Sequence, residues 1–367
     1  MLKKVIKKCA VTILTRRGYT PYMAAEVYDY ILSDLFEYRG AGLKEKIWAY
    51  KHGFLSERSS ELQLDESNCK NYLPDFSYYK LHPINGKYSS WIDDKVTLRY
   101  ILGDYAEYLP KYYYELQQNI VSRLPDCPAG FHSDIPGIIR LLDKEKELAA
   151  KPVSASCGVG FCKFSATSQG YLINKKLVSK NDMEQFLSTL DHYVITEYIH
   201  PHQDIRKIYD LSPNSVRIVL LHELNKEPII LQAFFRIGTE ESGMVDNLSA
   251  GGMSCDINID NGELSRPLIF KNNVAVAQLE HPQSKVKIEG YLPLWEQVKE
   301  KIFEIADYYP QLVYMGIDVV VTDDSFKIIE INSLPDLFQL YCPVMKNEKL
   351  KEFFQKRMHL RRGEENK

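Results

Sequence analysis

The segment from residue 316 to residue 332 constrains the fold of this chain more than any other. Two runs of apolar and β-branched residues flank the polar residues 322 to 325, and this pattern predicts a β-hairpin. Polar side chains interrupt both runs, because Asp318 lies in the first and Glu330 and Asn332 lie in the second. Residues two apart on a strand point to the same face, so folding the hairpin about its turn brings Asp318 opposite the other two.

These three oxygen-bearing side chains indicate a cation site. A carboxylate inside an apolar strand is costly unless it is paired or coordinates a cation. Two carboxylates and an amide suit Mg²⁺, with Mn²⁺ as a substitute, because Mg²⁺ keeps waters and takes other ligands from phosphates. The alternative is a hairpin whose polar face is merely solvated. We accept that alternative for Asp323 and Asp324, and we predict a metal site at Asp318, Glu330 and Asn332.

A second hairpin is predicted between residues 151 and 163. Here a strand ends in Lys-Pro, small residues and two glycines follow, and an apolar run restarts. A flexible tip of this kind can lay backbone N–H groups against phosphate oxygens, and Lys151 would add a positive charge. The spacing matches neither the P-loop nor the dinucleotide fingerprint, so a small-residue loop without a ligand stays open as an alternative.

Two arginines lie in strands that are otherwise apolar. Arg217 lies within residues 215 to 221, and Arg236 lies within residues 228 to 237. Such a strand seldom contains an arginine unless the side chain meets an anion. That anion is either a ligand or one of the carboxylates of the predicted metal site, and the sequence leaves both open.

Composition narrows the class of protein. With 367 residues, 45% hydrophobic and 26% charged, the chain has the composition of a globular protein of two or three domains rather than of a disordered or membrane-embedded one. A net charge of -3 offers no global positive field for a nucleic-acid backbone. The seven scattered cysteines contain no C-x-x-C pair, and no stretch resembles an export signal, so we expect a reducing cytoplasm.

The chain divides into a helical part and a part dominated by strands. Residues 1 to 62 have helical spacing, residues 63 to 90 read as a mostly irregular connection, and residues 91 to 109 are helical again. Strand signals dominate from there to residue 345, except for helical spacing in residues 291 to 309. This order predicts an α+β region behind a helical one.

Together the two hairpins and the strand end at residues 196 to 199 resemble the ATP-grasp superfamily. Their order along the chain and the 12 residues from Asp318 to Glu330 both suit it. The resemblance covers about residues 91 to 345. Short motifs are similar, more narrowly, to the sugar-transfer-associated ATP-grasp family: Asp94-Lys95, Leu109-Pro110, Asn214 to Arg217, Phe235 to Gly238, Val245 to Leu248, Gly251-Gly252 and His281-Pro282.

The resemblance implies an ATP-grasp fold, in which two α+β subdomains clasp ATP, preceded by a helical N-terminal region. We expect a helical region and linker in residues 1–90, the lysines and the glycine-rich lid in residues 91–195, and the metal and phosphate site in residues 196–350. Residues 351–367 would form a basic C-terminal tail.

The resemblance also implies the ATP contacts. Lys95 and Lys151 would bind from two segments, and residues 154 to 160 would form a phosphate lid that departs from common ATP-grasp loops in carrying Cys157. The strand end would line the adenine and ribose. The expected ATP-binding residues are Lys95, Lys151, Ser156, Gly158, Gly160, Glu197, Tyr198 and Ile199.

The remaining site residues follow from the same resemblance. Arg217 and Arg236 would be catalytic and would hold the γ-phosphate and the acyl phosphate formed from it, since guanidinium groups bind phosphate in a bidentate way. For the turn at residues 246 to 252, a purely structural role stays open beside a substrate contact. The expected substrate contacts are Asp246, Asn247, Gly251, Gly252 and His281.

The implied activity is an ATP- and Mg²⁺-dependent ligase that joins a carboxylate to an amine or a thiol. We expect small-molecule substrates, an amino acid with a sugar acid or an amino sugar, in surface polysaccharide synthesis. A phosphotransferase and a non-catalytic ATP-binding scaffold remain as alternatives.

The ends of the chain are rich in positive charge. Lysines and arginines between residues 3 and 17, and again between residues 356 and 362, stand out against the overall charge of -3. Two interpretations stay open: solvated termini, or contact with an anionic membrane face or a membrane-bound glycosyltransferase.

Overall fold

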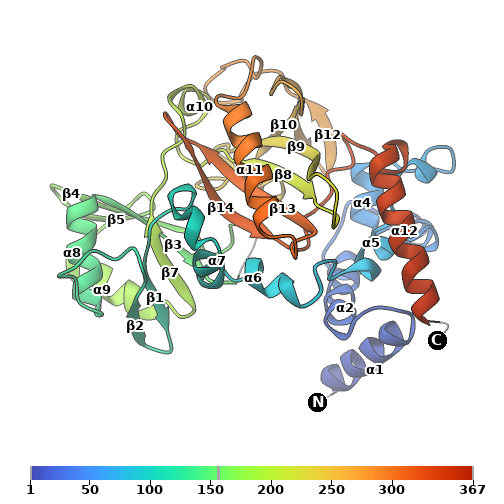
Figure 1. Ribbon diagram of the computed structural model, residues 1–367, viewed down its shortest axis with the longest axis horizontal. Coiled ribbons are helices and arrows are strands. Elements are labelled where there is room, and N and C mark those ends of the chain that lie inside the picture. Colours follow the sequence, from blue (N-terminus) through green and yellow to red (C-terminus); the bar gives the residue numbers. More distant parts are fainter. Residues whose placement is uncertain (1, 155–157, 366–367) are drawn as a thin grey trace.

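The computed structural model describes residues 2–154 and 158–365. Helices form the N-terminal part, as expected, and reach the first strand through short 3-10 turns (Figure 1). The predicted irregular connection at residues 63 to 90 contains the helix α5. These elements are α1 (Leu2–Arg16), α2 (Pro21–Phe36), α3 (Leu43–Lys51), α4 (Ser56–Glu61), η1 (Cys69–Asn71), α5 (Asp75–Leu81), η2 (Gly86–Ser89), α6 (Ser90–Asp93), α7 (Lys95–Ile101) and η3 (Gly103–Tyr108).

The first sheet has seven strands among the described residues, in the order β2-β1-β7-β3-β4-β5-β6, and every neighbouring pair is antiparallel. Its strands are β1 (Tyr112–Gln117), β2 (Ile120–Arg123), β3 (Glu147–Pro152), β4 (Cys162–Thr167), β5 (Gly170–Ile173), β6 (Lys176–Val178) and β7 (Tyr193–Glu197). The helices α8 (Ile135–Glu145) and α9 (Lys180–Thr189) share one buried cluster with Leu148, Ala150 and Phe164. Because side chains alternate along β3, Ala149 and Lys151 lie on the other face.

The second sheet also has seven antiparallel strands in the part of the chain that is described, in the order β12-β11-β10-β9-β8-β13-β14. Its strands are β8 (Val216–Leu221), β9 (Ile229–Ile237), β10 (Met253–Ile257), β11 (Leu264–Lys271), β12 (Val274–Ala277), β13 (Tyr314–Val321) and β14 (Phe326–Asn332). The remaining elements are α10 (Gln203–Ile208), η4 (Leu248–Ala250), α11 (Trp295–Tyr308), η5 (Val344–Lys346) and α12 (Glu348–Glu365).

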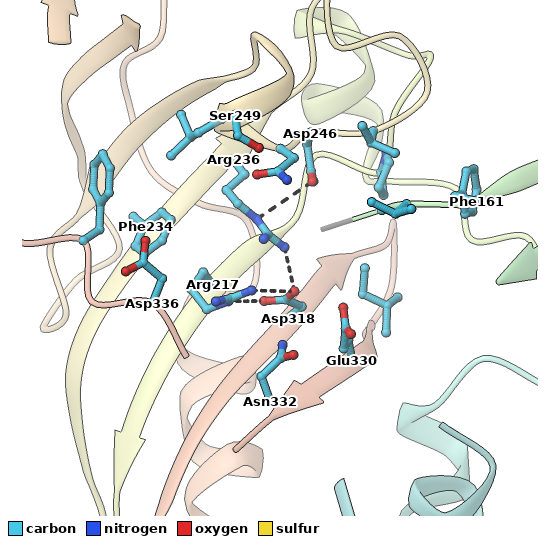
Figure 2. Close-up of a pocket in the computed structure, with 18 of the residues that line it drawn as sticks. Phe161, Arg217, Phe234, Arg236, Asp246, Ser249, Asp318, Glu330, Asn332 and Asp336 are labelled. Carbon is cyan, nitrogen blue, oxygen red and sulfur yellow. Dashed lines mark hydrogen bonds and ion pairs between the residues drawn. The ribbon is translucent and has the colours of Figure 1, made fainter. Parts of the chain in front are cut away.

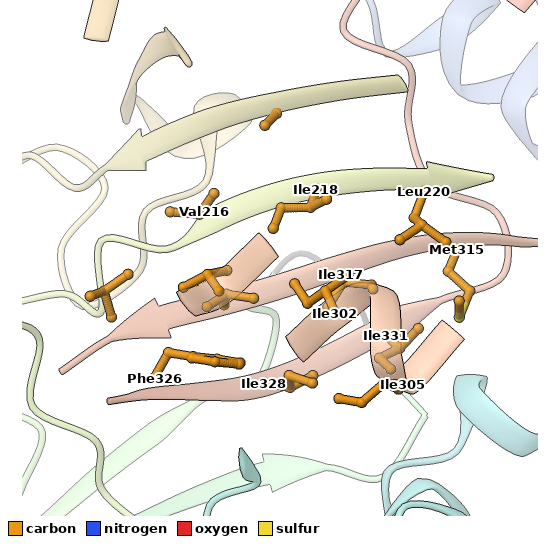
Figure 3. Close-up of a cluster of buried hydrophobic side chains, with 14 of the residues drawn as sticks. Val216, Ile218, Leu220, Ile302, Ile305, Met315, Ile317, Phe326, Ile328 and Ile331 are labelled. Carbon is orange, nitrogen blue, oxygen red and sulfur yellow. The ribbon is translucent and has the colours of Figure 1, made fainter. Parts of the chain in front are cut away.

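The helix α11 covers one face of the second sheet. Ile302 and Ile305 of this helix pack on Ile218 of β8, Ile317 of β13 and Ile331 of β14 (Figure 3). All five side chains are at most 1% exposed. Burying a side chain of this size stabilises the fold by about 1.5–3 kcal/mol, so this contact anchors the strands that carry the site.

The opposite face of the second sheet is divided in two. Toward one end, Val219, Leu221 and Tyr314 pack with Phe353 and Phe354 of α12, and α5 joins the same cluster. Toward the other end the face carries polar side chains instead. The helix α5 from the N-terminal part and the C-terminal helix α12 therefore meet on this face of the sheet (Figure 1).

Two details of the predicted organisation need correction. Residues 351–365 of the expected basic tail instead belong to the helix α12, because Leu350, Phe353 and Phe354 are buried in a core. The expected boundary between residues 195 and 196 falls inside β7, which belongs entirely to the first sheet. The hairpin of β1 and β2 was not predicted. Its three tyrosines, Tyr112 to Tyr114, are buried packing groups.

Candidate nucleotide and metal site

A cavity of about 730 Å³ lies between the two sheets. Lys151 and Tyr198 line it from the first sheet, and Arg217, Asp318 and Glu330 line it from the second. Figure 2 shows the arginines and carboxylates of the second sheet grouped on one wall of this cavity. Its volume falls within the range of about 300–1,000 Å³ that is typical of small-molecule sites.

A β-bulge places the polar side chains of the predicted hairpin in this cavity. The strands β13 and β14 pair with Asp318 opposite Glu330, and the register then shifts, so that Val319 pairs with Ile328. Without the shift, Glu330 would share a face with Ile328, which is buried against α11. The bulge therefore keeps Ile328 in the core and turns Glu330 toward the cavity.

Asp318 binds both of the predicted catalytic arginines. Arg217 donates to its two oxygens through Nε and through an Nη atom that lies 3.0 Å from Oδ2, and the Arg236 guanidinium lies 2.8 Å from Oδ2. The Asp318 side chain is 2% exposed. The sequence left open whether the arginines meet a ligand or a carboxylate of the predicted metal site. In the structure they meet the carboxylate of Asp318.

The charges of this cluster are strongly coupled. Burial on its own raises the pKa of Asp318, but Arg217 and Arg236 outweigh it and hold that pKa below the usual value. The carboxylate in turn raises the pKa of Arg217 against the effect of burial. Asp318 and Arg217 are therefore both charged at neutral pH. The two guanidinium groups have more N–H donors than one carboxylate can accept from, which suits phosphate.

The donor set fits Mg²⁺ when phosphates complete the shell. A carboxylate has about four acceptor positions, and the arginines use three of those on Asp318, which leaves one. Glu330 accepts from Lys95 Nζ at 3.1 Å, and Asn332 lies beside it in Figure 2. Among the described residues, no three His, Cys, Asp or Glu side chains form a metal site by themselves. A Mg²⁺ ion held by Asp318, Glu330 and Asn332 would therefore need further ligands from the phosphates of a substrate, as is usual for Mg²⁺ sites with few protein ligands.

The two predicted lysines approach the cavity from different elements. Lys95 lies in the first turn of α7, is 5% exposed, and its backbone N–H donates to Val153 O. Lys151 lies on β3. Burial, together with the nearby Lys95, lowers the pKa of Lys151 to about 8. An anionic ligand would offset this repulsion, so these residues can hold a polyphosphate.

Replacing either lysine by methionine is expected to weaken nucleotide binding about 10- to 150-fold, which corresponds to about 1.5–3 kcal/mol for a lost charged hydrogen bond.

For the wild type, the affinity for the nucleotide should also fall as the pH rises above about 8. The bound phosphates favour the charged form of Lys151, and the pKa of this lysine is about 8 without them. Calorimetry in two buffers should show proton uptake on binding near pH 8.5. Lys151→Met should abolish that uptake, and Lys95→Met should reduce it without abolishing it, because burial still lowers the pKa of Lys151 when Lys95 is absent. Unchanged affinity in both variants would reject the site.

The expected adenine contacts line the cavity where β7 ends. Glu197, Tyr198 and Ile199 are all lining residues, and Glu197 Oε2 accepts from the backbone N–H of Lys111 at 3.1 Å. Lys163, to which the sequence assigned no role, holds Tyr198 from one side. Its Nζ lies 3.8 Å from the centre of the Tyr198 ring and 2.6 Å from Glu147. A cation–π contact with Lys163 therefore orients the Tyr198 ring where it lines the cavity.

The glycine-rich lid is described only in part, and Ser156 and Cys157 lie outside the described residues. Gly158 lines the cavity with a φ of +68°, and a Cβ atom there would lie 2.7 Å from Val245. Gly160 has a φ of +76° and does not line the cavity. A left-handed backbone at both glycines agrees with a tight loop tip.

The expected substrate contacts separate into two groups. Asp246, Asn247 and Gly251 line the cavity, and Asp246 accepts from Ser215 N at 2.5 Å and lies 3.8 Å from Arg236. Gly252 does not line it. A Cβ atom there would meet Asn247 O at 2.8 Å, so the close backbone approach in this turn requires glycine, which is the structural role left open above.

His281 is a correction to the predicted site. Its side chain is 0% exposed, Nε2 lies 2.9 Å from Gly238 O, and Nδ1 accepts from Ser284 N. Burial lowers the pKa of His281, which keeps the ring neutral. We conclude that this histidine packs the loop and does not contact substrate.

The N-terminal helices supply a wall of the cavity that sequence reasoning missed. Arg58 of α4 lies 2.6 Å from Asp336, 2.8 Å from Glu61 and 3.5 Å from Asp75. All four side chains line the cavity, as do Glu57 and Tyr79. No motif marks these helices, because their place in the site comes from packing against α12 and the second sheet.

Comparison with known families decides the assignment. Residues 77–352 match the family described as sugar-transfer associated ATP-grasp. The chain belongs to that family. The match begins 14 residues before the predicted start at residue 91, and it confirms the expected superfamily and the expected α+β ATP-grasp fold with helices before it. The predicted enzyme class, an ATP-dependent ligase of the ATP-grasp type, agrees with this membership.

Solved structures resemble this ATP-grasp protein only distantly. D-alanine–D-alanine ligase from Bacillus anthracis is 17% identical with a TM-score of 0.38, over 79% of this chain and 71% of that one. The ATP-grasp ligase PsnB with its minimal precursor is 12% identical with a TM-score of 0.38, over 75% and 63%. N5-carboxyaminoimidazole synthase from Aspergillus clavatus is 10% identical with a TM-score of 0.35, over 70% and 50%. The chain thus spans less than two thirds of the last two, and no curated protein matches it.

Proposed function

We propose that this protein is an ATP- and Mg²⁺-dependent ligase that joins a carboxylate to an amine through an acyl phosphate. The observation that carries the proposal is the cluster of Arg217, Arg236 and Asp318 in a cavity that Lys95 and Lys151 also line. Positive groups from both sheets face one space there. Such an arrangement stabilises the charge that develops on a phosphoryl group during transfer.

Each group has a part in the proposed reaction. Lys95 and Lys151 hold the phosphates of ATP, and Arg217 and Arg236 neutralise the γ-phosphoryl group as it moves to the substrate carboxylate. Asp318, Glu330 and Asn332 would hold Mg²⁺, which supplies Lewis-acid charge at the phosphate oxygens. The amine then displaces phosphate from the acyl phosphate and leaves an amide. Positioning provides most of the acceleration, and no protein nucleophile is needed.

The wall formed by the N-terminal helices supports an amine as the acceptor. Glu57, Glu61, Asp75 and Asp336 bring four carboxylates to the cavity, and Arg58 balances one of them. Burial raises the pKa of Glu61 to about 7 and that of Asp75 to about 6. A substrate ammonium group relieves this excess of negative charge when it binds, and it would pass one proton to a neighbouring carboxylate before the neutral amine attacks the acyl phosphate.

The family description supports a role in sugar transfer. We propose an amino acid as one substrate and a sugar acid or an amino sugar as the other, in the assembly of a surface polysaccharide.

An ADP-release screen of amino acids against sugar acids, amino sugars and nucleotide sugars tests the proposal. We expect ADP release only with a matched pair, and mass spectrometry should find an amide. A stable phosphate ester as the product would instead identify a phosphotransferase. Binding of ATP without turnover for any pair would favour a non-catalytic scaffold.

A further inference from the structure

The helix α1 lies at the edge of the molecule, apart from both sheets (Figure 1). It packs on α2, where Val11 and Leu14 contact a cluster that includes Met23 and Val27. Lys7, on the same side of the helix, is 2.6 Å from Asp29 of α2. The inward face of α1 is therefore packed against α2, and these contacts leave the composition of its outward face unexplained.

The outward face of α1 is apolar. Val5 is 53% exposed, Ile6 is 49% exposed and Ile13 is 53% exposed, and Cys9 is exposed between them. Val5, Cys9 and Ile13 follow one another at four-residue steps, so they form a single stripe along the helix. Leaving such a stripe in water forfeits the free energy that its burial would provide.

Basic side chains border this apolar stripe. The helical spacing puts Lys4 and Lys8 along one edge and Lys3 along the other. Residues 2 to 17 carry six lysines and arginines, and the first acidic residue of the chain is Glu26. Among the described residues, Lys7 alone of these six forms an ion pair. An apolar stripe between basic edges is the pattern of a helix that lies in the surface of an anionic membrane.

We propose that α1 docks this protein on a membrane surface rich in anionic lipid, with Val5, Ile6 and Ile13 inserted among the headgroups. Anionic lipid attracts the lysines at both edges, and the apolar stripe supplies the remaining free energy. A second copy of this chain fits poorly, because its lysines would face these lysines across the interface. Within the parts of the chain that the structure describes, no helix is long and apolar enough to span a membrane.

The basic residues near the other end of the chain do not carry this inference. Lys356 lies 3.6 Å from Glu223, and the Arg357 guanidinium lies over the Phe353 ring. Lys356 is thus paired with a residue outside α12, and Arg357 packs on an aromatic ring of its own helix.

Vesicle flotation of the whole chain tests the proposal. The chain should float with vesicles of phosphatidylcholine and phosphatidylglycerol at low salt, float much less at high salt, and stay behind with phosphatidylcholine alone. Lys4→Gln together with Lys8→Gln should weaken binding about 25-fold, since each lysine near such a surface contributes about fivefold. Ile6→Asp together with Ile13→Asp should abolish it.

Leu224→Asp is the matched control, because Leu224 is 73% exposed and lies outside α1. This variant should bind vesicles like the wild type. An environment-sensitive dye on Cys9 should shift to the blue when anionic vesicles are added. Equal binding to neutral and anionic vesicles, equal loss in the Leu224 variant, or an unshifted dye would each overturn the proposal. So would a dimer in solution that the Ile6 and Ile13 substitutions dissociate without any binding to vesicles.

Discussion

Replacing Glu330 by glutamine is expected to reduce ATP-dependent turnover by at least about 100-fold while the protein stays folded, since removing one preorganised charge contact of this kind has that order of effect. The substitution keeps the shape of the side chain and removes the negative charge that would attract Mg²⁺ and that pairs with Lys95 at 3.1 Å. Steady-state ADP release at millimolar Mg²⁺ measures the loss, and thermal unfolding checks the fold.

The turn of the same hairpin provides the control for this experiment. Asp324→Asn also removes one carboxylate, but Asp324 is exposed and does not line the cavity. Its activity should match that of the wild type. If Glu330→Gln kept normal turnover, the assignment of the metal to this hairpin would be wrong.

Replacing Arg217 by methionine is expected to lower the free energy of unfolding by about 3–5 kcal/mol and to abolish turnover. The methionine keeps most of the volume but leaves Asp318, which is 2% exposed, with Arg236 as its remaining strong cationic partner. Breaking a buried pair by removing one member has this cost because the other charge stays desolvated. Urea unfolding at pH 7 measures it.

Arg206→Met is the control for Arg217→Met. Arg206 lies 3.2 Å from Asp323 in an exposed pair, so its loss should lower the free energy of unfolding by at most about 1 kcal/mol.

The loss of unfolding free energy in Arg217→Met should also depend on pH. The folded state holds the pKa of Asp318 below its unfolded value, so the stabilisation is complete above the unfolded pKa and is lost as the pH falls through the folded one. Equal costs for the two arginines would contradict the buried pair.

The sequence by itself determined the strands that carry the site and most of the groups on them. Apolar runs bounded by turn residues predict β13 and β14 to within about two residues, because strand periodicity is a local property. Asp318, a charged position in one of those runs, and Arg217, a charged position in the run that forms β8, stand out for the same reason. A charge in a buried strand is costly, and it therefore marks a place where a partner or ligand lies.

Only the tertiary structure decided which anion meets the arginines and which residues complete the cavity. Asp318 and Arg217 are 101 residues apart in sequence, and β13 becomes the neighbour of β8 through packing on α11 that no local pattern records. Arg58 and Asp75 enter the cavity because α5 and α12 pack on the same sheet. The bulge that turns Glu330 toward the site depends on Ile328 staying beneath α11. Such contacts arise from long-range burial, and a single sequence carries no local signal of it.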